Sequence, residues 1–191
     1  MQQQRPLSKH DIRDTLVGLR GAGLEFWRSF DPERFWSVGV GVWSPADNVR
    51  HLTMATLPVV QALRMPRLML RLLFGVAREP SQARDVLRAR YQDELARGAK
   101  AGRFTPRPGR LPVRLGEEQQ RLIDQCAESL GRLEKAMAPW SETQLDRYRL
   151  PHPVLGRVTV REMLMFTLFH FDHHRDTVSR RMELPLTQRE S

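Results

Sequence analysis

The feature that most constrains this chain is helical periodicity. Four segments repeat apolar residues at helical spacing, and no segment shows the alternation bounded by turn signals that predicts a sheet. We therefore expect an all-α fold. At 191 residues the chain is long enough for one core and short for two, so we expect a single domain over residues 1–191. The predicted long helices cover residues 8–30, 44–63, 117–137 and 159–183.

Two of these helices have clear start signals. Ser44 can cap a helix, Pro45 suits its first position, and Asp47 stands where a capping box places its acid. Thr159 and Glu162 have the same spacing at the start of the last helix. These signals place two helix starts at residues 44 and 159.

Other segments are less regular. Glycines 18, 21 and 23 weaken the second half of the first helix, and Pro58 predicts a bend in the second. Residues 35–43 are apolar but too rich in glycine for a helix, and we expect a short extended piece there. Residues 151–156 read as a loop.

Two further helical segments lie between the second and third long helices. Residues 64–78 are basic and carry leucines and methionines almost all round, which favours a helix that covers the bundle over one that lies on a membrane surface. This apolar content also predicts a homodimer formed through helix faces. Residues 81–97 predict another helix, and residues 98–116, with three prolines, predict a surface connection.

Charge and composition exclude several classes. The formal net charge is +9, but only three of the 31 basic residues are lysines and the arginines are interleaved with acids, which argues against nucleic-acid binding. The longest apolar run, Leu72–Ala77, is far short of the roughly 20 residues of a membrane span. No apolar signal segment opens the chain. The single Cys126 excludes an internal disulfide and lies on the apolar stripe of its helix, so we expect a buried thiol in a soluble, cytoplasmic protein.

Three of the six histidines fall within five residues of the last predicted helix. Residues four apart on a helix differ by about 40° around its axis, so His170 and His174 point the same way, while His173 lies about 100° from one of them. Two imidazoles so placed can bind one metal ion, and a third ligand must come from another helix. His51, in the second turn of a capped helix and beside apolar neighbours, is the candidate.

Spacing alone leaves other interpretations open. A histidine on an apolar helix face is often a core residue with its hydrogen bonds satisfied. The residues between His170 and His174 do not form the H-E-x-x-H motif of metalloproteases, so that class lacks its general base. Asp47, four residues before His51, can accept the second ring proton of that histidine or cap its helix.

Two stretches resemble the DinB-like family. Residues 43–52 are similar to its W-S-x-x-x-x-x-x-H-L motif, and residues 156–162 with 170–175 are similar to its final helix, G-x-[LV]-[ST]-x-x-E followed by H-x-x-x-H-R. The resemblance implies an up-down-down-up four-helix bundle, here with an extra helical segment between helices two and three, and frequent homodimers. It also implies a site for zinc, nickel, iron or manganese formed by His51, His170 and His174.

The resemblance leaves the function in two classes. Relatives include transferases and isomerases that use mycothiol, bacillithiol or glutathione, so we expect a metal-dependent enzyme with a small-molecule substrate and a low-molecular-weight thiol, or a hydrolase. The alternative is a non-catalytic metal-binding protein of a stress response or an interaction. An enclosed pocket beside the histidines favours the enzyme, whereas a site sealed by Met54 or Phe171 favours the alternative.

Overall fold

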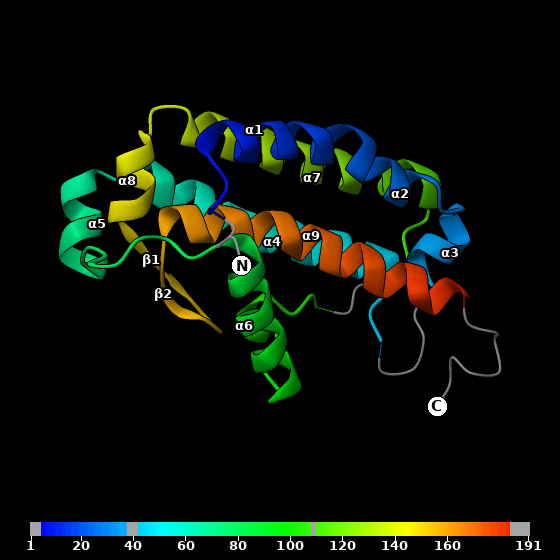
Figure 1. Cartoon of the computed structure of the whole chain (residues 1–191). Coiled ribbons are helices and arrows are strands. Elements are labelled where there is room, and N and C mark those ends of the chain that lie inside the picture. The colour runs from blue at the N-terminus through cyan, green and yellow to red at the C-terminus, as the bar shows by residue number, and fades with distance from the viewer. Residues whose placement is uncertain (1–4, 38–41, 108–109, 184–191) are drawn as a thin grey trace.

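A computed structural model shows a mostly helical protein with one small sheet (Figure 1). It describes residues 5–37, 42–107 and 110–183. In chain order the elements are α1 (Lys9–Gly18), the π-helical turn η1 (Leu19–Gly23), α2 (Leu24–Arg28), α3 (Pro32–Trp36), α4 (Pro45–Arg64), α5 (Arg67–Phe74), α6 (Arg84–Ala96), the 3-10 turn η2 (Gly102–Phe104), α7 (Leu115–Met137), α8 (Glu142–Arg147), β1 (Arg149–His152), β2 (Gly156–Thr159) and α9 (Val160–Glu183).

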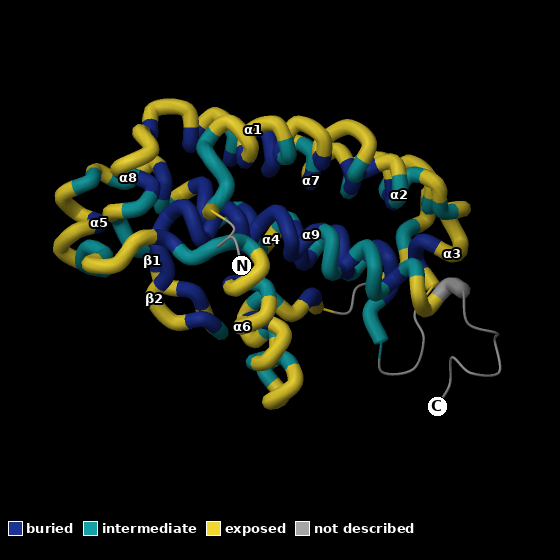
Figure 2. The backbone as a smooth tube through the Cα atoms, viewed as in Figure 1, coloured by how far each residue is buried: buried dark blue, intermediate teal, exposed yellow. Residues whose placement is uncertain are grey.

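The long helices pack around a common core. Helix α4 packs along α7 and α9, and α1 contacts the same two helices. Figure 2 shows that the exposed residues of α1 lie on its outer side, whereas α4 and α9 are largely buried. Mostly helical architecture is therefore confirmed, while the up-down-down-up order of a four-helix bundle stays a prediction.

Both predicted capping boxes are present. The Ser44 hydroxyl accepts from the Asp47 N–H at 3.0 Å, and the Asp47 carboxylate accepts from the Ser44 N–H at 3.2 Å. The corresponding distances for Thr159 and Glu162 are 3.1 and 2.7 Å. Each box satisfies two N–H groups that a helix start would otherwise leave unpaired, so both helices that carry the candidate ligands begin at defined residues.

The first helical segment keeps its direction through the three glycines but widens there into the π-turn η1. Helix α4 continues past Pro58 to Arg64. The prediction that residues 35–43 are non-helical is wrong at its start, because Asp31 caps a short helix with Pro32 at its first position, and this helix extends to Trp36. Residues 38–41 of that segment lie outside the described residues.

The prediction of no sheet is wrong. The segment expected as a loop forms an antiparallel hairpin, in which Arg149 pairs with Thr159 and His152 with Gly156. Strands of four residues are too short to show alternation in the sequence, and β1 is held in place by packing on α5 and α9. The short helix α8, which also escaped prediction, precedes this hairpin.

The stripe predicted on the third long helix is buried in α7. Cys126, Leu130 and Leu133 are fully buried, and Leu122 at the start of the stripe is half-buried. Burial raises the pKa of the Cys126 thiol to about 12, so the thiol stays protonated and unreactive near neutral pH. The interpretation of Cys126 as a core residue is confirmed.

Helix α5 covers the core with only one side. Leu70 is fully buried, whereas Leu68 and Leu72 are 66% and 77% exposed. A homodimer that covers this outer side stays a prediction. Within the described ranges, no helix combines the length and the apolar character that a transmembrane segment needs.

Candidate metal centre

Two long helices bring the three predicted histidines together. His51 comes from α4, and His170 and His174 come from α9; all three are buried. The Nε2 atoms of His51 and His174 lie 3.2 and 3.0 Å from Nε2 of His170. One ligand atom from each ring lies within 4.8 Å of the others. The predicted juxtaposition of His51 with the last helix is therefore observed.

The protonation of His51 follows from its second ring nitrogen. Nδ1 lies 2.8 Å from the backbone carbonyl oxygen of Phe104 in η2. A carbonyl can only accept, so Nδ1 is the donor and carries the proton of the neutral ring. Nε2 of His51 consequently presents a lone pair toward His170.

The same argument applies to His174 through Asn48. The Asn48 side-chain amide donates to the Ser44 carbonyl at 2.8 Å, which turns its oxygen toward His174. Nδ1 of His174 lies 2.7 Å from that oxygen and therefore donates to it. Nε2 of His174 is then a second lone pair that faces His170. Nε2 of His170 can carry a proton and donate it to one of these two neighbours. The Nε2 atoms of His51, His170 and His174 therefore hold at most one proton among them.

This donor set fits a divalent ion. Ring nitrogens at 2.0–2.1 Å from a tetrahedral zinc ion lie about 3.3 Å from one another, close to the two separations seen between the histidines. Hydrogen bonds from the second ring nitrogen to a carbonyl or amide oxygen are also the usual outer contacts of metal-binding histidines, and they set tautomer and ring orientation. His51 and His174 both have such contacts.

Burial keeps the cluster neutral. It lowers the pKa of His51, and it lowers the pKa of His170 and His174 well below the usual value; charge repulsion among the histidines acts in the same direction. Neutral imidazole is the form that binds metal ions. The three rings are therefore ready as ligands near neutral pH.

The contacts of Asp47 and His173 show what these two neighbours of the cluster do. Asp47 caps α4 and forms an ion pair with Arg50 at 3.0 Å, so capping is its role and the alternative of orienting His51 is wrong. His173 is half-buried outside the three-histidine cluster, with its ring centroid 6.0 Å from that of Tyr91. Asn48, rather than Asp47, supplies the side-chain oxygen that orients a ligand.

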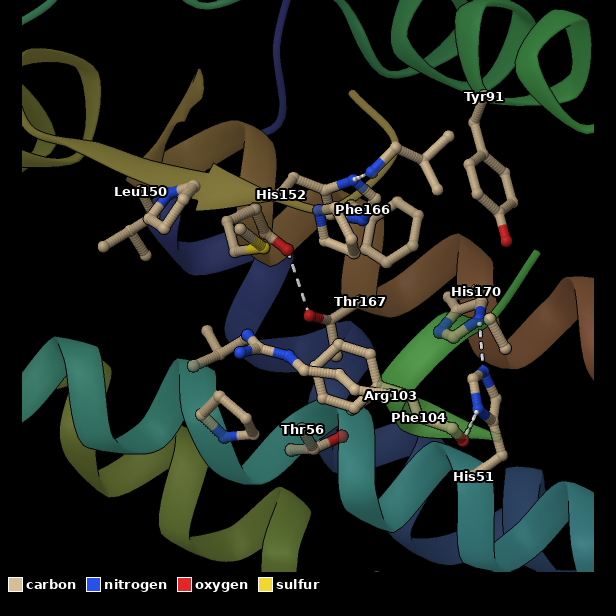
Figure 3. Close-up of a pocket in the computed structure, with 18 of the residues that line it drawn as sticks. His51, Thr56, Tyr91, Arg103, Phe104, Leu150, His152, Phe166, Thr167 and His170 are labelled. Carbon is tan, nitrogen blue, oxygen red and sulfur yellow. Dashed lines mark hydrogen bonds between the residues drawn. The ribbon is translucent and has the colours of Figure 1, made fainter. Parts of the chain in front are cut away.

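A cavity of about 400 Å³ lies beside the histidines (Figure 3). Its walls are mainly apolar and aromatic. Neither Met54 nor Phe171, the side chains considered as a seal, lines it. The aromatic residues among the walls are Trp43, Phe74, Tyr91, Phe104 and Phe166.

Several residues of the site escaped prediction. The segment expected to be a surface connection contains η2, whose Arg103 and Phe104 line the cavity, and Phe104 also holds His51 through its carbonyl. Tyr91 of α6 and His152 of β1 line the cavity as well. Nothing in the local pattern of these residues signals a site, because they reach it only through the packing of α6, η2 and the hairpin on the long helices.

His152 is a buried neutral histidine outside the cluster. Its Nδ1 accepts from the backbone N–H groups of Val154 and Leu155 at 3.2 and 3.0 Å. Nε2 therefore carries the proton of the neutral ring. Burial lowers the pKa of His152 to about 4.

This pKa predicts an acid-sensitive fold. The unfolded chain takes up a proton at His152 below its ordinary pKa of about 6.5, while the folded chain resists until about pH 4. The contribution of the neutral His152 ring to the free energy of unfolding is complete above pH 6.5. It is lost as the pH falls toward 4, at about 1.4 kcal/mol per pH unit. Between pH 7 and 5, the free energy of unfolding of the wild type should therefore fall by about 2 kcal/mol more than that of His152→Gln. Urea unfolding in chelator at both pH values measures this.

The matched control is His10→Gln, which replaces an exposed histidine of α1. It should lose as much stability between pH 7 and 5 as the wild type does. Equal losses in the wild type and His152→Gln would show that His152 is not the acid-sensitive group.

The fold and the site together define a helical protein with a buried trio of histidines beside a cavity. The model of the DinB superfamily matches residues 16–178, most of the chain, so the protein belongs to the DinB superfamily. No curated protein and no solved structure matches it. The family match confirms the resemblance seen in the two motifs.

Proposed function

We propose that this protein binds one divalent metal ion through His51, His170 and His174 and is a metal-dependent enzyme. The observation that carries the proposal is the shortage of protons among three buried ring nitrogens separated by 3.0 and 3.2 Å. One proton on His170 can pair with only one of its two neighbours, so at least one buried lone pair stays unpaired, and a divalent cation would remove this cost. A divalent ion held there would supply Lewis acidity.

The surroundings of the cluster favour catalysis over storage. The cavity reaches the histidines, so a substrate has room beside them. Figure 3 shows the Tyr91 hydroxyl directed into the region of His170. Burial raises the pKa of Tyr91 to about 12, which keeps this hydroxyl protonated as a donor. We assign the reaction to the thiol-dependent transferases and isomerases of the family, with a hydrolase as the neighbouring class and a non-catalytic metal-binding protein as the alternative.

Elemental analysis of protein purified without a histidine tag tests the metal. We expect about one zinc, nickel, iron or manganese ion per chain, and the ion should be removable by a chelator without unfolding the protein. A chain that neither retains nor takes up any of these ions would contradict the proposal and leave the histidines as core residues.

The thiol class is tested on protein in which cobalt(II) occupies the site. Glutathione should change the visible absorption spectrum of the cobalt, while S-methylglutathione, which has no free thiol, should not. Mycothiol and bacillithiol are the further probes in the same assay. A spectrum that no thiol changes would exclude the thiol-dependent class.

A further inference from the structure

Among the described residues, basic side chains line the cavity and acidic side chains do not. Lys100 and Arg103 line it, and no aspartate or glutamate does so within the described residues. Elsewhere in the molecule arginines meet carboxylates, as Arg84 does with Asp172 at 3.0 Å. Lys100 and Arg103 are exposed, so solvent reaches their charge, but no described carboxylate of the cavity compensates it. Such a positive charge attracts anions.

Arg103 is the better placed of the two cations. In the part of the chain that the structure describes, its guanidinium makes no hydrogen bond and no ion pair with protein groups, and it lies 4.9 Å from the centroid of the Phe104 ring. Figure 3 shows its side chain running across the cavity, with the guanidinium on the side away from His51 and His170. The cavity thus has histidines at one end and a free guanidinium toward the other.

The remaining polar groups of the cavity include two free donors. The hydroxyls of Thr56 and Thr167 are not among them, because each donates its proton to a backbone carbonyl of its own helix and can only accept from a ligand. His152 has its Nδ1 occupied and presents an N–H from Nε2. The Tyr91 hydroxyl has no hydrogen-bond partner among the described residues and stays protonated. A ligand that satisfies the Tyr91 hydroxyl and the His152 N–H must supply acceptors.

We propose that the cavity binds a small organic acid. Its carboxylate pairs with the Arg103 guanidinium, its apolar body lies between the aromatic walls, and its other end lies beside the histidines. A guanidinium binds a carboxylate through two parallel hydrogen bonds, which gives orientation as well as charge. A volume of about 400 Å³ is in the range of small-molecule sites. The inference names the substrate class of the enzyme proposed above, and it rests on that proposal for the reaction but not for the binding.

The test compares an acid with its amide. We choose 4-phenylbutanoate and 4-phenylbutanamide, which differ in charge but little in size, and measure their dissociation constants by calorimetry in metal-free and zinc-loaded protein. The acid should bind metal-free protein about tenfold or more tightly than the amide. Arg103→Gln should abolish this preference, and Arg103→Lys should keep part of it because a point charge remains. Arg132→Gln, which changes the net charge equally at an exposed ion pair of α7, should leave it unchanged.

Each outcome decides between the two proposals. Equal binding of acid and amide, or no binding of either at millimolar concentration, would overturn the organic-acid proposal. A preference that survives Arg103→Gln and appears only with zinc would put the acid on the metal and overturn the role of Arg103. A preference that depends on Arg103 in a protein that binds no metal would uphold the acid site while the metal proposal fails. Circular dichroism spectra of the variants show whether each remains folded.

Discussion

Replacement of His174 with alanine should abolish metal binding and leave the protein folded. His174 supplies one of three converging ring nitrogens, and its loss leaves two ligands on an ion that needs at least three for a stable site. We expect the metal affinity to fall by more than the roughly 10–100-fold that loss of an outer hydrogen-bond partner costs. Competition with a chelator of known affinity measures this fall, and thermal unfolding with and without chelator checks the fold.

His173→Ala is the matched control, because it removes an imidazole of the same helix that packs edge-on against His174, with 5.4 Å between the ring centroids, but is not one of the three converging ligands. It should keep the metal and most of the stability, since the His173 ring is only half-buried. If His173→Ala loses the ion while His174→Ala retains it, the wrong face of α9 has been assigned. If neither change matters, the rings are structural.

Replacement of Leu130 with alanine should destabilise the protein more than loss of the metal does. Leu130 is fully buried in the core of α7. Leucine-to-alanine changes at such sites cost about 2–5 kcal/mol, because the folded chain loses the favourable burial of the deleted methyl groups and keeps a cavity in their place. The total stability of a domain is commonly about 5–15 kcal/mol, so this is a large share of it. Urea unfolding in the presence of chelator measures the change without any contribution from metal.

Leu122→Ala controls for helix propensity and for the change in side-chain size. Leu122 lies on the same stripe two turns earlier but is only half-buried, so its replacement should cost clearly less. A Leu122 variant as unstable as the Leu130 variant would mean that the start of α7 is packed more tightly than its exposure indicates. A metal-free parent that is already unfolded would show that the ion, rather than this core, holds the fold together.

The long helices could be predicted from the chain because their signals are local. A serine or threonine cap with an acid three residues later, as at Ser44 and Thr159, places a helix start with little help from the rest of the fold. The apolar stripe of α7 identifies its buried face in the same way. The hairpin β1–β2 could not be predicted, because its four-residue strands depend on contacts with α5 and α9 that lie outside the local sequence.

For the candidate ligands, too, the local sequence predicts one part and tertiary contacts decide the other. His170 and His174 share a helix face by the geometry of the helix itself, so the sequence alone determined that their rings lie close together. The sequence also singled out His51, since it follows a well-capped start. The hydrogen bonds that set its tautomer and that of His174 come from Phe104 and Asn48, and these partners lie 53 and 126 residues away along the chain.

The residues that line the cavity are brought together only by the tertiary structure. Arg103 and Phe104 belong to a stretch whose prolines indicate only a surface connection, and Tyr91 and His152 come from two further elements. The sequence by itself determined the helical class, the main helix starts and the three histidines, because each depends on spacing within one helix. Only the packing of distant elements decided which oxygens orient the rings and which cations face the cavity, because hydrogen bonds and charge balance depend on distances in space.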